Sequence, residues 1–227
     1  MHALTRRLVA ELLGTAVLVA VVIGSGIIGT QLSDDVAVAL LINAASTVCG
    51  LGVLIWLLGP VSGAHFNPVV TAVAVWRREM RGIDALGYLI AQVAGGLLGA
   101  ALANAMFSLP LVNASAHVRD GGSLWLGEIV ATAGLLLVIG ALGRTGRGHL
   151  GPVIVAAWIG SAYFFTSSTS FANPAVTIGR SISDTFAGIA PSSVAMFVVM
   201  QVVGAAIGAV LTNVLFPRSA DAARSGA

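Results

Sequence analysis

Two copies of one short motif contain the residues of this chain best suited to do chemistry. They are His65-Phe66-Asn67-Pro68-Val69-Val70-Thr71 and Ser170-Phe171-Ala172-Asn173-Pro174-Ala175-Val176-Thr177. An Asn-Pro pair suits the start of a helix, because asparagine accepts from backbone N–H groups there and proline at the first helical position has no N–H to leave unpaired. Each motif therefore predicts a helix start that combines a positive dipole end with an amide side chain able to donate a hydrogen bond.

The rest of the sequence indicates that both motifs lie within a membrane. Of its 227 residues 57% are hydrophobic and only 9% are charged, which excludes an ordinary soluble domain. The small positive charge is too dispersed to indicate a nucleic-acid partner. Six long apolar runs predict spanning helices at 8–29, 36–58, 86–107, 124–142, 150–165 and 193–215. The segments 67–76 and 173–183 are too short to cross and are predicted to be re-entrant half-helices.

The two halves of the chain repeat. Matched residues recur at similar spacing: Asn67 with Asn173, Glu11 with Glu128, and Gln92 with Gln201. Because each repeat has three spans, an odd number, the second repeat is inverted in the membrane relative to the first. This inversion brings the two asparagines together near the midplane. We therefore expect a single domain over 1–227, with inverted repeats at about 5–110 and 122–216 and a tail at 217–227. All arginines except Arg119 and Arg180 fall in the termini and alternate loops, so both ends are predicted to be cytoplasmic, in a multi-pass protein of the cell (inner) membrane.

These features resemble the aquaporin and glycerol-facilitator family. The resemblance rests on six spans, two inverted halves, the string Ser62-Gly63-Ala64-His65-Phe66-Asn67-Pro68 and an Asn-Pro-Ala at 173–175. The first motif departs from the family pattern, because it reads Asn-Pro-Val. It implies an all-α membrane fold with a passive pore in each subunit of a homotetramer, without cofactor, metal or catalysis. The implied central constriction consists of Asn67, Pro68, Val69, Asn173, Pro174 and Ala175.

The family sets its selectivity at four positions, which counting from the motifs assigns to Thr47, Ser161, Ser170 and Val176. The residue after the second motif is normally arginine in the family and is Val176 here. Because valine brings neither charge nor fixed donors, we predict a wide, neutral constriction. Water, glycerol, urea and metalloid acids such as arsenous acid are the expected solutes.

Arg180 lies four residues after Val176, on the same face of the helix one turn farther out. Its side chain either folds back into the lumen, which would narrow the pore and guard it against cations, or stays in an outer vestibule, held by loop carbonyls or Asp184. We favour the vestibule.

Glu11 and Glu128 are acidic residues within predicted membrane spans. Because burying a charge in the bilayer costs free energy, such residues are candidates for a functional role. Their symmetric placement favours a structural role, in which they accept hydrogen bonds from the re-entrant loops, as the resemblance also implies. The alternative is a proton-coupled secondary transporter of a small polar solute that uses Glu11 or Glu128. An intramembrane enzyme is a third and more distant interpretation.

Overall fold

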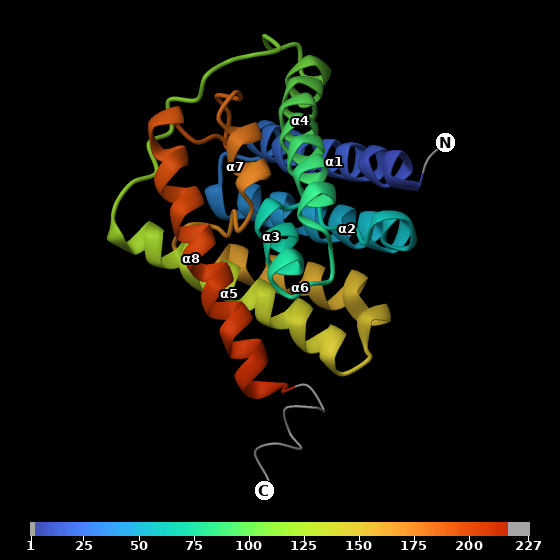
Figure 1. Cartoon of the computed structure of the whole chain (residues 1–227). Coiled ribbons are helices and arrows are strands. Elements are labelled where there is room, and N and C mark those ends of the chain that lie inside the picture. The colour runs from blue at the N-terminus through green and yellow to red at the C-terminus, as the bar shows by residue number, and fades with distance from the viewer. Residues whose placement is uncertain (1–2, 218–227) are drawn as a thin grey trace, which may run out of the picture.

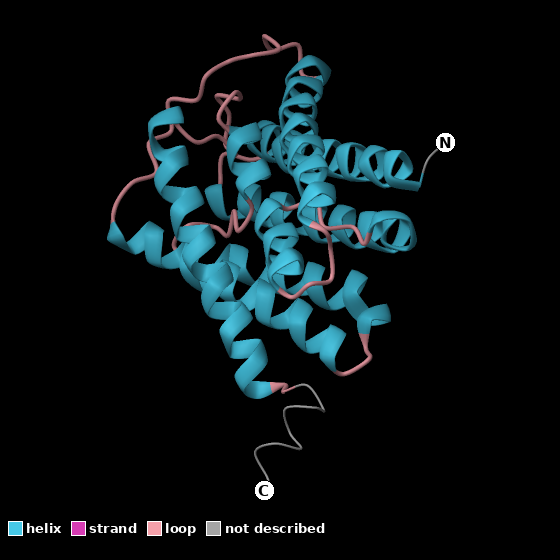
Figure 2. Cartoon of the chain, in the orientation of Figure 1, coloured by secondary structure: helices cyan, strands magenta, loops and turns pink. Residues whose placement is uncertain are grey.

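The computed structural model describes residues 3–217, and every regular element within them is helical (Figures 1 and 2). In chain order these elements are α1 (Ala3–Leu32), α2 (Val36–Ser62), α3 (Pro68–Trp76), α4 (Gly82–Met106), α5 (Gly122–Arg144), the short 3-10 helix η1 (Gly148–Leu150), α6 (Gly151–Phe165), α7 (Pro174–Arg180) and α8 (Pro191–Leu215). Six helical segments are long and apolar enough to cross a membrane, α6 together with η1 counting as one of them. The six predicted spans are thereby confirmed. The predicted tail at 217–227 lies, apart from Pro217, outside the described residues.

The short helices α3 and α7 begin where the Asn-Pro motifs predict. The side-chain oxygen of Asn67 accepts from the backbone N–H of Val69 at 3.1 Å, and that of Asn173 accepts from the N–H of Ala175 at 2.9 Å. Nine residues in α3 and seven in α7 give helices of roughly 14 and 11 Å, well short of the apolar thickness of a bilayer. Both are therefore half-helices, as the sequence predicts.

Close helix crossings hold each half together. In the first half α1 packs mainly on α4, and in the second half α5 packs mainly on α8. A Cβ atom on Gly99 would lie 2.1 Å from the carbonyl oxygen of Ala16, and one on Gly208 would lie 2.2 Å from that of Ala133. Only glycine permits these approaches, so both crossings depend on the same small residue at matched positions.

The half-helices lie at the centre of the bundle, where α3 contacts α4, α7 and α8, and α7 contacts α1, α4 and α8 (Figure 1). At one end of the molecule the loop between α4 and α5, residues 107–121, runs along the segment that follows α7. The backbone N–H of Asn113 donates to the carbonyl of Ile182 at 2.9 Å, and that of Ser115 donates to Ser181 at 3.0 Å. This α4–α5 loop therefore closes over the C-terminal end of α7.

Candidate pore

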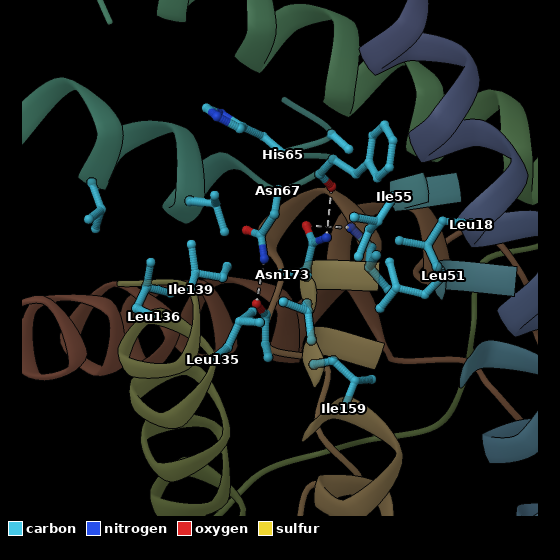
Figure 3. Close-up of a pocket in the computed structure, with 18 of the residues that line it drawn as sticks. Leu18, Leu51, Ile55, His65, Asn67, Leu135, Leu136, Ile139, Ile159 and Asn173 are labelled. Atoms are coloured by element: carbon cyan, nitrogen blue, oxygen red, sulfur yellow. Dashed lines mark hydrogen bonds between the residues drawn. The ribbon is translucent and has the colours of Figure 1, made fainter. Parts of the chain in front are cut away.

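The two Asn-Pro motifs meet through a reciprocal pair of hydrogen bonds (Figure 3). Nδ2 of Asn67 donates to the carbonyl oxygen of Ala172, and Nδ2 of Asn173 donates to the carbonyl oxygen of Phe66, both at 2.8 Å. Each acceptor is the residue directly before the asparagine of the other motif. The sequence predicts that the motifs converge, but it does not predict these crossed bonds.

Both asparagines line one cavity of about 330 Å³. An amide nitrogen carries two hydrogens, and each Nδ2 uses one of them in the crossed bond. The second hydrogen of each amide is therefore left for a molecule in the cavity. Each Oδ1 accepts from the start of its own half-helix, so the hydrogen that each Nδ2 leaves free is a donor offered to the cavity.

The cavity walls near the asparagines are mostly apolar (Figure 3). Leucine and isoleucine side chains from four spanning helices make up this wall, namely Leu18, Leu51, Ile55, Leu135, Leu136, Ile139 and Ile159. His65, Arg77 and Glu79 line the cavity on the first-motif side, and Arg180 lines it on the second-motif side. A polar molecule inside the cavity therefore finds hydrogen-bonding groups at the two ends of the cavity and at the asparagines, and mostly apolar side chains between them.

Three of the four predicted selectivity residues line this cavity, and the fourth does not. Thr47, Ser170 and Val176 are buried and face it. Ser161 is exposed on the outer surface of α6 and is not among the described residues that line the cavity, so this prediction is wrong. Tyr163, two residues farther along α6, is buried, lines the cavity and places its Oη 3.2 Å from Oγ1 of Thr47.

The error at Ser161 has a geometric cause. Two residues along an α-helix correspond to a rotation of about 200°, so a miscount of two turns the side chain from the cavity to the outer surface. The buried positions of α6 include Val155, Ile159, Ala162 and Tyr163, which follow the spacing of one helix face. In the sequence nearly every residue of α6 is apolar, so no periodicity there could select Tyr163 over Ser161.

Arg180 combines the two positions that the sequence presents as alternatives. Its side chain is only 3% exposed, and its Nε donates to the carbonyl oxygen of Ala187 in the loop after α7. The guanidinium carbon lies 3.4 Å from the centroid of the Phe171 ring. Asp184 is occupied elsewhere, since it accepts from the backbone N–H of Ala116. Arg180 is thus anchored to a loop carbonyl, as the vestibule interpretation expects, and it lines the same cavity as Val176.

Glu11 of α1 holds the loop that precedes α3. Its carboxylate accepts from the backbone N–H groups of His65 at 3.0 Å and Phe66 at 2.7 Å, and from Nε2 of Gln92 at 2.8 Å. The backbone of Phe66 has a φ of 48°, in the left-handed region that costs a non-glycine residue about 1 kcal/mol or more. The carboxylate therefore stabilises a loop conformation that the loop's own residues disfavour.

Glu128 of α5 does the same for the loop that precedes α7. It accepts from the backbone N–H groups of Phe171 at 2.9 Å and Ala172 at 3.0 Å, and from Nε2 of Gln201 at 2.6 Å. Ala172 has a φ of 48°, like its counterpart in the first loop. Neither Glu11 nor Glu128 is among the described residues that line the cavity.

Comparison with known proteins places this architecture in a family. The sequence profile described as major intrinsic protein matches residues 1–171. The chain belongs to the major intrinsic protein family. It is 48% identical over 202 residues to "Aquaglyceroporin AqpS" of Rhizobium meliloti, covering 89% of this chain and 86% of that protein. It is 32% identical over 235 residues to "Aquaporin Z" of Photorhabdus laumondii, covering 93% and 97% of the two chains.

A solved structure supports the fold of this major intrinsic protein independently. The aquaglyceroporin from Plasmodium falciparum matches it with a TM-score of 0.73 over 94% of this chain and 98% of that chain, at 18% identity. The family and the all-helical membrane fold predicted from the motifs are therefore confirmed. Within this family the chain carries valine, Val176, at the position after the second motif, and that side chain is buried beside the cavity.

Proposed function

We propose that this major intrinsic protein is a passive, bidirectional channel for water and small uncharged solutes. Glycerol and urea are the first candidate solutes, and metalloid acids such as arsenous acid are further ones. The observation that carries the proposal is the pair of asparagine amides, Asn67 and Asn173, which each hold one free N–H toward an otherwise apolar stretch of the cavity. Similarity to a protein named an aquaglyceroporin supports glycerol among the solutes.

The two amides explain why such a channel would pass neutral molecules and stop protons. A water or hydroxyl group beside Asn67 and Asn173 presents its oxygen to both donors, which turns its own hydrogens away from the constriction. This orientation interrupts a continuous donor-to-acceptor wire. The N-terminal ends of α3 and α7 each add roughly half a positive charge at the same place, which opposes cations in a poorly screened environment.

The apolar wall favours small solutes that need few hydrogen bonds at one time. Thr47 and Tyr163 place hydroxyl groups on the second-motif side of the cavity, and Val176 adds no charge there. A molecule such as glycerol can exchange water for these hydroxyls and for the asparagine amides in turn. No covalent chemistry is required of any residue, in keeping with a family of channels rather than enzymes.

Proton coupling through Glu11 or Glu128 is not favoured. Each carboxylate accepts at least three hydrogen bonds from buried donors and lies away from the cavity, so its protonation would release the loop it holds. We further infer a homotetramer in the lipid bilayer of the cell (inner) membrane, with both termini cytoplasmic. The distribution of arginines supports the orientation.

The proposal is tested with purified protein in liposomes by stopped-flow light scattering. Gradients of water, glycerol, urea and arsenous acid should each relax faster than in empty liposomes, without saturation and with a weak temperature dependence. Asn173→Leu removes one amide and its crossed bond, and it should slow water and glycerol together. Saturable uptake that a pH gradient drives uphill would overturn the channel and favour a carrier.

A further inference from the structure

The inverted repeat pairs two positions on each half-helix that face the cavity. Aligned on the asparagines, Val70 of α3 corresponds to Val176 of α7, and Ala74 of α3 corresponds to Arg180 of α7. All four residues line the cavity. The first pair is identical in the two halves. The second pair places a methyl group on one side of the cavity and a guanidinium group on the other, so the two half-helices present different chemistry at equivalent positions.

We propose that Arg180 supplies a fixed positive charge to the second-motif side of the pore, and that this charge, rather than the width of the pore, excludes cations there. This inference rests on the proposed channel function and names a residue that determines its selectivity. It also replaces the expectation of a neutral constriction at Val176: the valine is uncharged, but a cation-repelling group stands one helical turn beyond it.

The contacts of Arg180 leave its charge available to the cavity. Its Nε is used by the carbonyl of Ala187, and its two terminal nitrogens have no hydrogen-bond partner among residues 3–217. Within the same residues, several unpartnered polar side-chain atoms have no accessible surface, but the terminal nitrogens of Arg180 are not among them. Because Arg180 lines the cavity, these nitrogens are open to it. No described carboxylate lies in ion-pair contact with Arg180, and its charge is therefore not neutralised locally.

The guanidinium group is held in a fixed position. It stacks on the ring of Phe171 at 3.4 Å, a cation–π contact that strengthens when the pair is shielded from water. Phe171 itself is fixed, because its backbone N–H donates to Glu128 and its ring packs edge-on against Phe197 at 5.2 Å. A passing solute therefore meets the Arg180 guanidinium group in one fixed position beside the pore.

Arg119 of the α4–α5 loop positions this charge without lining the cavity. Its Nε donates to the carbonyl of Gly188 at 2.9 Å, and its Nη2 lies 3.5 Å from the carbonyl of Phe186. These two carbonyls flank Ala187, whose own carbonyl accepts from Arg180. The guanidinium of Arg119 also lies over the Phe171 ring, 5.1 Å from its centroid. Arg119 therefore fixes both groups that hold Arg180.

A matched pair of solutes separates charge from size. Urea and guanidinium are planar molecules of similar shape, and only guanidinium is charged at neutral pH. In proteoliposomes, Arg180→Leu should raise uptake of radiolabelled guanidinium roughly tenfold or more while urea uptake changes little. Arg180→Lys keeps the positive charge, so its guanidinium uptake should stay well below that of R180L. Arg147→Leu removes the same charge from an exposed loop and should behave as the wild type.

A charge-restoring experiment makes the result independent of folding defects. Arg180→Cys in a Cys49→Ser background carries its thiol only at position 180. A cationic methanethiosulfonate reagent should return guanidinium uptake to the wild-type level, whereas a neutral reagent of similar size should not. Equal effects of the two reagents, or no reaction with either, would overturn the proposal, as would unchanged guanidinium uptake by R180L.

The positioning role of Arg119 is tested by a double variant. Arg119→Leu should raise guanidinium uptake less than R180L does, and it should add nothing in an R180L background, because both changes act through one group. An additive increase would assign Arg119 a separate effect and overturn its positioning role. Urea and glycerol uptake by the wild type alone tests the proposed function, so the two inferences fail separately.

Discussion

In the first half of the chain Glu11 of α1 meets Gln92 of α4 at 2.8 Å, and in the second half Glu128 of α5 meets Gln201 of α8 at 2.6 Å. Each glutamine also donates, at 2.9 Å, to the threonine hydroxyl four residues after the asparagine of its own half. Each glutamate binds two backbone N–H groups of its re-entrant loop. The buried polar frame is thus the same in both halves.

The side chains attached to this frame differ. At the position two residues before the asparagine, the first half has His65, packed edge-on against Tyr88 at 5.4 Å. The second half has Phe171, packed edge-on against Phe197 at 5.2 Å, with Arg180 on its face. The packing geometry is kept while the chemistry changes. Helix crossings and loop anchors therefore constrain the frame in both halves, whereas the groups around the two ends of the pore have diverged.

The shared frame is tested most severely by removing its carboxylates. Glu11→Ala and Glu128→Ala each leave at least three buried donors without acceptors, and the loops lose the contacts that hold their left-handed residues. We expect each change to lower the free energy of unfolding by about 3–5 kcal/mol. The measurement is thermal or denaturant unfolding of the purified protein in detergent.

Asp34→Ala is the matched control, because it removes an exposed acid of the α1–α2 connection and should change stability by less than about 0.5 kcal/mol. The comparison between the halves is sharper than either value alone. If one glutamate proves indispensable and the other neutral, the two loops are not held by equivalent frames, and the symmetry argument fails.

The sequence predicts what local signals encode. Hydropathy identifies the six spans, and the Asn-Pro pairs identify the starts of α3 and α7, because capping depends only on residues adjacent in the chain. The assignment of Ser161 to the selectivity positions was wrong because it depended on a residue count across a loop. An error of two residues in that count selects the opposite face of the helix. The crossed bonds of Asn67 and Asn173 could not be predicted from the sequence. They require a left-handed backbone conformation at Phe66 and Ala172, which no local propensity of these residues favours.

A difference in packing between the halves gives a second test. A Cβ on Gly14 of α1 would lie 2.0 Å from the ring of Phe66, whereas the aligned positions of the second half, Ala131 and Ala172, are both alanine. Gly14→Ala should therefore cost about 1–3 kcal/mol through overpacking. Combined with Phe66→Ala, which copies the pair found in the second half, it should cost less than the sum of the two single changes. Unfolding of the four proteins measures this coupling, and strict additivity would show that the ring moves aside.

The smallest expected effects compare the tyrosine hydroxyls near the two ends of the pore. Oη of Tyr88 accepts from Nε of Arg7 at 2.7 Å and donates to the carbonyl of Ser62 at 2.8 Å, whereas Oη of Tyr163 has one partner, Oγ1 of Thr47, at 3.2 Å. Tyr88→Phe should cost about 2 kcal/mol, because it removes two bonds, one of them to a charged group. Tyr163→Phe should cost about 1 kcal/mol or less.

Ser161→Ala is the control for the second of these changes. Ser161 is exposed on the same helix as Tyr163, so its loss should alter neither stability nor glycerol uptake in proteoliposomes. Tyr163→Phe should alter glycerol uptake, because it frees the Thr47 hydroxyl to bond with a passing solute. The reverse result, with glycerol uptake sensitive to position 161 and indifferent to 163, would mean that α6 presents its other face to the pore.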